Sequence, residues 1–517
     1  MKQAKTDLLK NLQTAFRKAL RKIEAAHAGE ITIEDPSRRA FLKRSFTGIG
    51  ALTATRMLSY AQQMPYLSEV SREYSIGILG AGIAGLHAAY ILQKAGFNST
   101  VYEAGRRSGG RMFTATDLLG KGITTELGGE FIDSIHTDIL NLATEFELPL
   151  IDTAQDRNLK KQIFYIGGIM YDADDLVEAF VPYAQQMKED MDGLPEMITY
   201  QDYGNAAQWD NMSIAAYLKL REITGWLYKL LDVAYTTEFG LDIKEQSAIN
   251  FMVYFNPQTP RELFGESDEQ YKIQGGNQRI PDEIVKRLKS VKLGYEATKI
   301  KSKGAGFEVS FSNNKIAHFD YLICAIPFTK LRQVELELNG MTAIKKKAIN
   351  ELGYGRNAKM FAGFHTRYWR DGGSGGQVFS DQPFQLGWDS SQLQKGNAGG
   401  YTFLTGGMMS DRMKDAPVAK KVTQYISQMH HIFPGAQKNY NGKNGIFHWP
   451  SNPLSLGSYS CYKVGQYTTI GGTEKEAIGN MLFAGEHCSY DFQGYMNGGA
   501  ETGRVAAETL ITKLTDH

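Results

Sequence analysis

Three glycines between residues 80 and 85 have the spacing that brings a peptide backbone close to a phosphate. The run Gly80-Ala-Gly82-Ile-Ala-Gly85 follows a short apolar stretch that predicts a strand, and it precedes a helical pattern. Gly80 permits a tight turn, Gly82 lets a pyrophosphate approach the helix N-terminus, and Gly85 lets helix and strand pack closely. Glu103 ends the next predicted strand, where a carboxylate accepts hydrogen bonds from ribose hydroxyls and disfavours a 2′-phosphate. The order of these features predicts a dinucleotide site.

Two further glycine-containing segments follow. Gly105-Arg-Arg-Ser-Gly109-Gly110-Arg111 resembles the second glycine motif of flavoproteins with two dinucleotide-binding units, which implies that Arg111 approaches the pyrophosphate of FAD. We expect Arg106 and Arg107 to be solvated. Glu126-Leu-Gly128-Gly129-Glu130-Phe131 is similar to a segment that passes the flavin ring in flavin amine oxidases.

Chemistry-bearing residues recur far along the chain. Residues 357–364 read as a strand with one charge, Lys359, among apolar neighbours. A buried lysine is costly unless it is paired or solvated, so Lys359 either reaches outward to solvent or serves at the cofactor. Gly485-Glu486-His487 ends a strand-like stretch and leads through a glycine-rich turn, 493–500, into a helix. A glycine-rich turn at a helix N-terminus accommodates polarised, electron-rich groups.

Together these blocks resemble the flavin amine oxidase family, which includes monoamine, polyamine and L-amino-acid oxidases, over roughly residues 74–512. The resemblance implies that FAD is the cofactor. The residues that it places at FAD are Gly80, Gly82, Ala84, Gly85, Glu103, Arg111, Gly128, Gly129, Ala297, Gly485, Glu486 and Met496.

The same resemblance implies the catalytic residues. Lys359 lies at the position of a lysine that holds a water against flavin N5. Tyr459 ends a block that begins at Trp449, and it would form one wall of an aromatic cage above the flavin. Tyr495 would form the opposite wall, so that two aromatic faces guide a neutral amine toward the ring. His487 could pass for a base, but we expect it to pack or to face solvent.

The cysteines do not indicate a metal site. Cys324, Cys461 and Cys488 form no CxxC pair, and their odd number argues against a disulfide framework. Monoamine oxidases attach FAD through a cysteine whose place is taken here by Ser458, and Cys461 lies beyond it. We therefore expect FAD to be bound non-covalently.

The substrate is less well defined. L-amino-acid oxidases bind the substrate carboxylate through an arginine where this chain has Glu130-Phe131. Residues 127–140 nevertheless resemble bacterial oxidases and dehydrogenases of basic L-amino acids. Glu130 and Asp133 would suit the cationic side chain of such a substrate or a polyamine, unless they are simply solvated loop carboxylates. We expect Glu130, Phe131, Tyr459 and Tyr495 to contact the substrate.

The leading hypothesis is oxidative deamination of an L-amino acid to a 2-oxo acid and ammonia. The resemblance implies hydride transfer to flavin N5 and reoxidation by dioxygen to give hydrogen peroxide. Alternatives are a primary amine or polyamine oxidase, a dehydrogenase that passes electrons to a quinone, and a flavoprotein that only binds its ligand.

The implied fold is α/β. We expect a Rossmann-like FAD domain with two dinucleotide-binding motifs, assembled from residues 71–149, 268–338 and 452–517. Residues 150–267 and 339–451 would form an α+β substrate domain with a helical insertion, including helices at Asp174–Met191 and Ile214–Leu231. A homodimer is implied by the family resemblance alone.

Residues 1–70 form a basic extension. Apolar residues at helical spacing over 8–23 predict a surface helix or a helix on a membrane surface. Ser37-Arg38-Arg39-Ala-Phe-Leu-Lys43 resembles the twin-arginine export signal, which implies a periplasmic or secreted protein; a retained basic helix would leave it cytoplasmic. The apolar stretch that follows, 46–61, is too short and polar to span a bilayer. The net charge of +1 argues against nucleic acid as the main partner.

Overall fold

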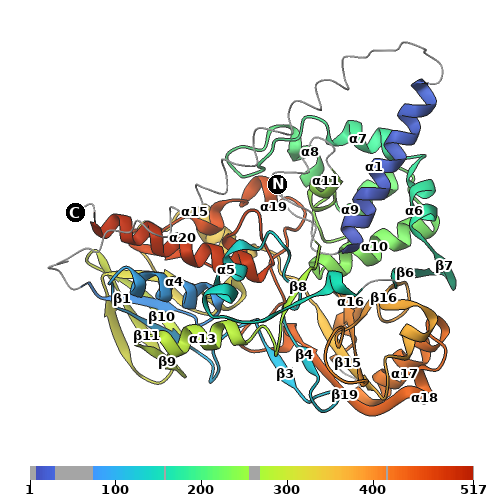
Figure 1. The fold of residues 1–517 in the computed structure, drawn as a ribbon. Helices are drawn as coiled ribbons and strands as arrows, with labels where there is room; N and C mark the ends of the chain where they lie inside the picture. Colours follow the sequence, from blue (N-terminus) through green and yellow to red (C-terminus); the bar gives the residue numbers. More distant parts are fainter. Residues whose placement is uncertain (1–6, 29–73, 157–158, 256–267, 415–416, 516–517) are drawn as a thin grey trace, which may run out of the picture.

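The computed structural model describes residues 7–28, 74–156, 159–255, 268–414 and 417–515 (Figure 1). Its first domain is built on a parallel sheet in the order β20-β13-β1-β2-β9. The strands are β1 (Ile76–Leu79), β2 (Ser99–Glu103), β9 (Val291–Leu293), β13 (Tyr321–Cys324) and β20 (Met481–Phe483). Their pairing is parallel throughout. Segments far apart in the sequence thus share one sheet.

Two helices cover one face of this sheet through unusually close backbone packing. α4 (Ile83–Lys94) follows β1, and α20 (Met496–Thr515) lies against it. A Cβ atom on Gly503 would lie 2.1 Å from the carbonyl oxygen of Ala84, and one on Gly85 would lie 2.0 Å from that of Gly80. Glycine is therefore required at both positions, since any side chain would push the elements apart.

Two more sheets complete the architecture. The sheet β12-β11-β10-β14 uses Ile316–Phe319, Gly306–Phe311, Ala297–Lys303 and Glu335–Glu337 and extends the first domain. The second domain holds the sheet β19-β15-β18-β17-β16-β6-β7. Its strands are Tyr440–His448, Ala358–Phe364, Gly399–Thr405, Leu386–Asp389, Ser374–Ser380, Lys160–Ile166 and Ile169–Tyr171. The predicted α/β class is confirmed.

Smaller elements join the domains. β3 (Thr114–Thr116) pairs with β4 (Thr124–Glu126), and β5 (Leu150–Asp152) pairs with β8 (Tyr271–Ile273). α5 (Thr137–Glu145) and α13 (Arg279–Arg287) flank the parallel sheet. α15 (Ala343–Glu351) and α17 (Val418–Ile432) pack elsewhere on the two domains.

The helical insertion is more broken than the sequence predicts. The stretch expected as one helix over 174–191 forms α6 (Ala173–Phe180) and α7 (Ala184–Met191), because Pro182 lies between them and has no amide hydrogen. The stretch over 214–231 forms α9 (Ile214–Leu220) and α10 (Gly225–Phe239). Glu222, between these two helices, and Gly225, the first residue of α10, have positive φ angles of 53° and 66°, which redirect the chain.

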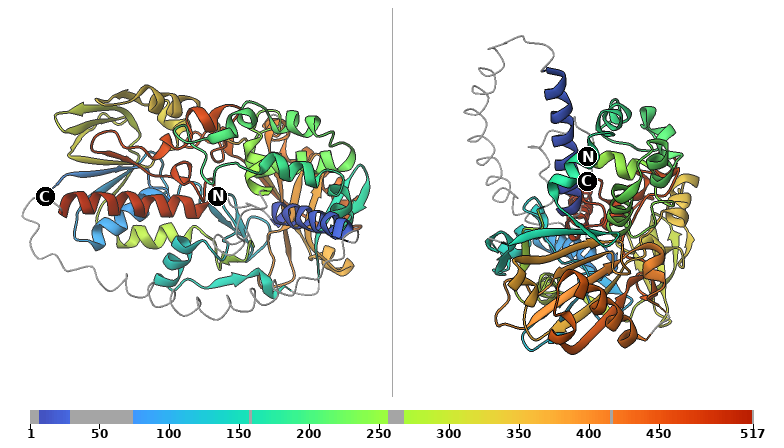
Figure 2. Two further views of the ribbon diagram at one scale, coloured as in Figure 1. Left: turned by 90° about the horizontal axis from the view of Figure 1, so that it is seen from above. Right: turned by 90° about the vertical axis from the view of Figure 1, so that its right-hand side faces the viewer.

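The N-terminal helix α1 (Asp7–Ala28) packs on this insertion (Figure 2). Its apolar face, including Leu12, Phe16 and Ala19, is buried against α6, α7 and α11 (Ile249–Phe255). Phe16 meets Phe180 edge-on, with ring centroids 6.0 Å apart. The prediction of a membrane-surface helix is wrong for this face, because the protein itself covers it. No helix in the described ranges is long and apolar enough to cross a membrane.

The twin-arginine-like motif at 37–43 and the apolar stretch at 46–61 lie outside the described residues.

The packing of α1 gives a testable stability effect. Phe16→Ala is expected to lower the free energy of unfolding by about 3 kcal/mol, because it removes a fully buried aromatic ring and leaves a cavity. Denaturant unfolding of the full chain measures the change. Lys18→Ala, on the exposed face of the same helix, is the control, and equal stability of both variants would contradict the docking of α1.

Candidate active site

A cavity of about 730 Å³ runs between the two domains. Glycine turns of the first domain line one end, and side chains of the second domain line the other. Of the residues that the sequence analysis singled out, the cavity is lined by Gly80, Gly82, Ala84, Glu103, Arg111, Gly128, Gly129, Glu130, Phe131, Ala297, Lys359, Tyr459, Gly485, Glu486, Tyr495 and Met496. Gly85 lies behind the lining, where it permits the close packing described above.

The dinucleotide end is shaped by the β1–α4 turn. Gly80 has a φ of 104°, and a Cβ on Gly82 would meet no protein atom within 4 Å, so it would project into open space. Glu103 accepts hydrogen bonds from the amides of Ala81 (2.8 Å) and Gly105 (2.7 Å). The carboxylate thus braces the turn while still lining the cavity. An open glycine cradle at a helix N-terminus beside a carboxylate fits the diphosphate and ribose of FAD.

Arg107 is not solvated, contrary to expectation. Its guanidinium donates to Gln278 and to the carbonyl oxygens of Ser108 and Met112, and it lies 4.0 Å from the ring centroid of Phe113. Burial lowers the pKa of Arg107 from its ordinary value, and the charge of Glu103 opposes that change. Arg107 therefore fixes the loop between β2 and β3, a role that no sequence motif indicated.

Arg111 and Glu486 form an ion pair in the cavity lining, and the carboxylate of this pair is buried. Arg111 Nη1 donates to Glu486 Oε1 at 2.7 Å and to the carbonyl oxygen of Ser458 at 2.8 Å. Glu486 also accepts from the amide and hydroxyl of Ser460 and from the amide of Gly494. Burial by itself would raise the pKa of Glu486, but Arg111 and these donors hold it below its usual value. Glu486 is therefore a carboxylate that joins three loops around the cofactor site.

Five consecutive carbonyl groups, from residue 126 to residue 130, are each held by a side chain. Lys359 donates to those of Glu126 (3.1 Å) and Gly128 (2.8 Å), and Trp449 Nε1 donates to that of Leu127 (3.0 Å). Asn277 donates to the carbonyl oxygens of residues 129 and 130. Asn277 is fully buried and was not predicted from the sequence. This segment therefore presents a fixed surface to the cavity.

Lys359 is buried at the cavity wall and does not reach outward to solvent. Only 7% of the residue is exposed, and its third contact is with Glu130 Oε2 at 3.2 Å. Glu130 also lies 3.7 Å from Lys272, another buried lysine that the sequence analysis missed. Trp388 packs beneath Lys359, with 5.1 Å between Nζ and the ring. The carboxylate of Glu130 and two carbonyl oxygens thus offset the free-energy cost of burying Lys359.

The two acids predicted to meet a cationic substrate are differently placed. Glu130 lines the cavity, but its carboxylate is paired with the two lysines. Asp133 is 1% exposed and lies outside the lining; it accepts from the amide of Glu269 and faces His136 at 3.4 Å. Neither is a solvated loop carboxylate. Two lysines compensate for the burial of Glu130, and a backbone amide donates to Asp133.

Aromatic side chains enclose the substrate end. Tyr459 and Tyr495 both line it, together with Phe131 and Trp388. Tyr459 donates to the carbonyl oxygen of Thr237 at 3.1 Å, and Tyr495 packs edge-on against His136, with centroids 4.8 Å apart. Burial, and next the charge of Glu238, raise the pKa of Tyr459 well above its usual value, so the phenol stays neutral. These are the features that a water-excluding amine site needs.

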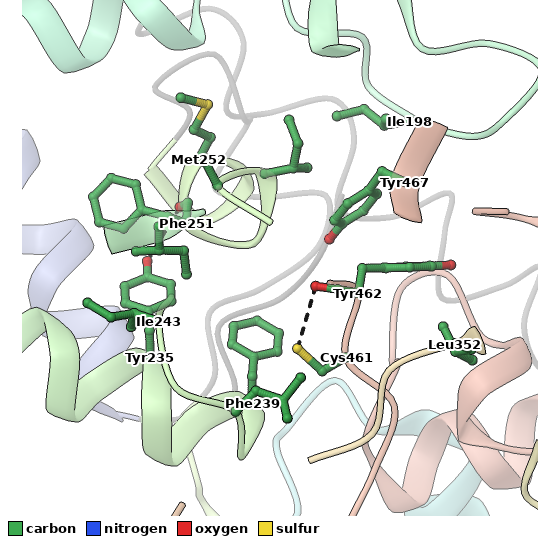
Figure 3. Close-up of a cluster of buried hydrophobic side chains, with 14 of the residues drawn as sticks. Ile198, Tyr235, Phe239, Ile243, Phe251, Met252, Leu352, Cys461, Tyr462 and Tyr467 are labelled. Carbon is green, nitrogen blue, oxygen red and sulfur yellow. Dashed lines mark hydrogen bonds between the residues drawn. The ribbon is translucent and has the colours of Figure 1, made fainter. Parts of the chain in front are cut away.

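No cysteine lines the cavity, and all three are buried. Cys461 lies in a hydrophobic cluster with Phe239 and Tyr462, where its thiol faces the carbonyl oxygen of Tyr462 at 3.7 Å (Figure 3). Ser458 lines the cavity and donates to Asn357 at 2.6 Å. The structure therefore places no cysteine at the cavity, and non-covalent binding of the flavin stays a prediction.

His487 packs in the core rather than serving as a base. It is 2% exposed, its ring centroid lies 4.4 Å from that of Phe328, and it is absent from the cavity lining. Burial lowers its pKa to about 3, so the imidazole is neutral.

Ionisation of Glu126 makes the stability of the folded protein depend on pH. Burial raises its pKa to about 7, although the amide of Asn277 and the hydroxyl of Thr114 act in the opposite direction. Between the ordinary value of 4.5 and about 7 the folded protein binds more protons than the unfolded chain, so stability falls as pH rises through this window. Across this window the ionisation of Glu126 is expected to cost the wild-type protein about 3 kcal/mol of its free energy of unfolding, and Glu126→Gln removes that cost. The cofactor-free variant should therefore be more stable than the cofactor-free wild type above the folded-state pKa. A parallel loss in wild type and variant would refute this assignment.

Comparison with known proteins indicates the same class of cofactor site as the geometry described above. The family model for flavin containing amine oxidoreductases matches residues 83–511. A Bacillus subtilis protein named "Putative L-amino-acid oxidase YobN" is 24% identical, over 86% of this chain and 96% of its own length. The flavin-containing amine oxidase of Oncorhynchus mykiss is 23% identical, over 85% of this chain and 86% of its own.

Solved structures show the same fold. Cyclohexylamine oxidase from Brevibacterium oxydans matches with a TM-score of 0.75 and 20% identity, over 86% of this chain and all of its own. Putrescine oxidase bound to putrescine matches with a TM-score of 0.72 and 17% identity, over 85% and 99% of the two chains.

The fold and the site thus define an FAD-dependent oxidoreductase. The chain belongs to the flavin-containing amine oxidoreductase family, and FAD is its cofactor. The residues present fit that group: the open glycine cradle and Glu103 suit its dinucleotide part, and the fixed 126–130 segment with Lys359 suits its ring.

Proposed function

We propose that this enzyme oxidises an amine that carries a second cationic group. The observation that carries this proposal is the distribution of charge along the cavity. The lining includes Glu238, which lies at the end of α10 close enough to Tyr459 to affect its pKa, and Glu269, which accepts from Gln377. Lys359 in the same lining is paired with Glu130. The arginines of the lining, within the described ranges, are Arg106, Arg107 and Arg111, which belong to the dinucleotide end. A site with carboxylates beside aromatic walls favours a cation.

When bound, FAD accepts two electrons and a proton from the substrate C–H next to nitrogen and returns electrons to dioxygen. The residues of this chain orient the substrate and exclude water. Tyr459 and Tyr495 restrict the amine to an edge-on approach, and Phe131, Trp388 and Leu386 line an apolar surface that displaces solvent. The resulting imine would hydrolyse to a carbonyl compound and ammonia.

Two substrate classes meet the requirement for a second cation. Basic L-amino acids are supported by the likeness of residues 127–140 to oxidases of that class and by the name of the Bacillus subtilis relative. Polyamines are favoured by the lack of an arginine at the substrate end among the described residues, because an α-carboxylate would have no guanidinium partner there.

Matched substrate pairs separate the two classes. L-arginine and agmatine, and likewise L-lysine and cadaverine, differ only by the α-carboxylate. Peroxide formation and anaerobic bleaching of the flavin are measured for each. We expect at least one member of each pair to exceed L-leucine and butylamine, and preference within the pairs identifies the class. Faster oxidation of the neutral-side-chain compounds would sink the proposal, and turnover with a quinone but little with oxygen would mark a dehydrogenase.

We also propose export by the twin-arginine route, which the motif at Ser37–Lys43 supports. Replacing Arg38 and Arg39 by lysine should retain the protein in the cytoplasm. Unchanged fractionation of the variant would count against export.

A further inference from the structure

All three N–H groups of the Lys359 ammonium already donate hydrogen bonds within the protein. An ammonium group has three N–H bonds, and its three acceptors here are the carbonyl oxygens of Glu126 and Gly128 and the carboxylate of Glu130. The family resemblance places a lysine-bound water at this position, which would require one of the three contacts to be given up. The longest of the three is the contact with Glu130, at 3.2 Å.

Glu130 is itself held from two sides. Its Oε2 faces Lys359 and its Oε1 faces Lys272, which comes from β8, whereas Lys359 comes from β15. All three side chains are at least nine-tenths buried. Lys272 also donates to the carbonyl oxygen of Ser390 at 3.3 Å and lies over the ring of Phe131 at 5.4 Å. The cluster therefore bridges the two domains and carries one net positive charge.

We propose that Glu130 and Lys272 are positioning residues that fix Lys359 and together set the positive charge beside the flavin ring. Glu130 accepts one N–H hydrogen bond from the ammonium and offsets its charge, and Lys272 offsets the charge of Glu130 in turn. This inference rests on the ring lying beside Lys359, as the proposed function requires. It assigns Glu130 to the cofactor's electrostatics rather than to the recognition of a cationic substrate.

The charges predict opposite signs for two conservative variants. A reduced flavin carries more negative charge than an oxidised one, so nearby positive charge favours reduction. Glu130→Gln keeps the shape and a hydrogen-bonding oxygen but leaves two uncompensated lysines, and it should shift the flavin midpoint potential positive. Lys272→Met removes a cation and should shift the potential negative. The double variant restores one net positive charge and should lie close to wild type.

The experiment is a redox titration of each holoprotein against reference dyes, followed by sulfite titration of the oxidised flavin. Sulfite binds electron-poor flavin as an anion, so we expect its affinity to rise about tenfold in Glu130→Gln and to fall about tenfold in Lys272→Met. Glu335→Gln, on β14, is the charge control, because the Glu335 side chain is 62% exposed. Retained flavin absorbance shows that each variant is folded and loaded.

Two results would overturn the inference: shifts of the same sign in both single variants, or no shift in either. Because neither readout uses a substrate, failure here is distinct from failure of the proposed function, which the substrate pairs test.

Discussion

Replacing Lys359 by methionine is expected to slow reduction of the flavin by substrate about 10²- to 10³-fold, the scale seen when one preorganised polar group is lost from an active site. Lys359 holds two carbonyls of the 126–130 segment and pairs with Glu130. Methionine has a similar length and no charge, so it removes these contacts while still filling the space. Stopped-flow absorbance of the holoprotein under anaerobic conditions measures the rate.

A matched control separates the effect of losing any lysine charge from the effect of losing it at position 359. Lys301→Met removes an exposed lysine on β10, whose side chain is 55% exposed, and should change the rate less than twofold. If Lys359→Met binds flavin normally and is reduced at the wild-type rate, Lys359 has no role in the reaction.

Truncating Glu486 to alanine is expected to weaken FAD binding by about 10²-fold or more. Loss of one partner from a buried, hydrogen-bonded charge pair typically costs about 2–5 kcal/mol. Here Arg111 would lose its anion, and Ser460 and Gly494 would lose their acceptor, so three loops that line the cavity would be released together. Titration of the cofactor-free protein with FAD, followed by quenching of flavin fluorescence, gives the dissociation constant.

The control for this prediction is Glu508→Gln on α20. Glu508 also pairs with an arginine, Arg504, but its side chain is 43% exposed, and solvent screens exposed pairs. FAD affinity that is equal in the Glu486→Ala variant and this control would contradict the role assigned to Glu486.

Local rules predicted the backbone geometry of the β1–α4 turn. Gly80, Gly82 and Gly85 have roles that follow from backbone geometry within one strand–turn–helix unit, and the structure shows a separate use for each of them. Such short-range constraints are written in consecutive residues. The same is true of Pro182, whose effect on the helical insertion could have been read from the sequence.

The electrostatics of the substrate end could not be predicted in the same way. Glu130 looked available for a cation because its partners, Lys272 and Lys359, lie far from it in the sequence. Asn277 and Lys272 belong to no motif, and only the meeting of β8, β15 and the 126–130 segment gives them a role. Likewise, the amphipathic pattern of α1 revealed an apolar face but not the insertion that covers it.

Anaerobic addition of substrate to the purified holoprotein tests the central claim most directly. We predict that L-arginine, L-lysine or a corresponding diamine bleaches the oxidised-flavin absorbance fully, and that admitting oxygen or a quinone restores it with one equivalent of oxidant reduced per flavin. A flavin-loaded protein that no amine or amino acid of the panel can bleach would contradict the account.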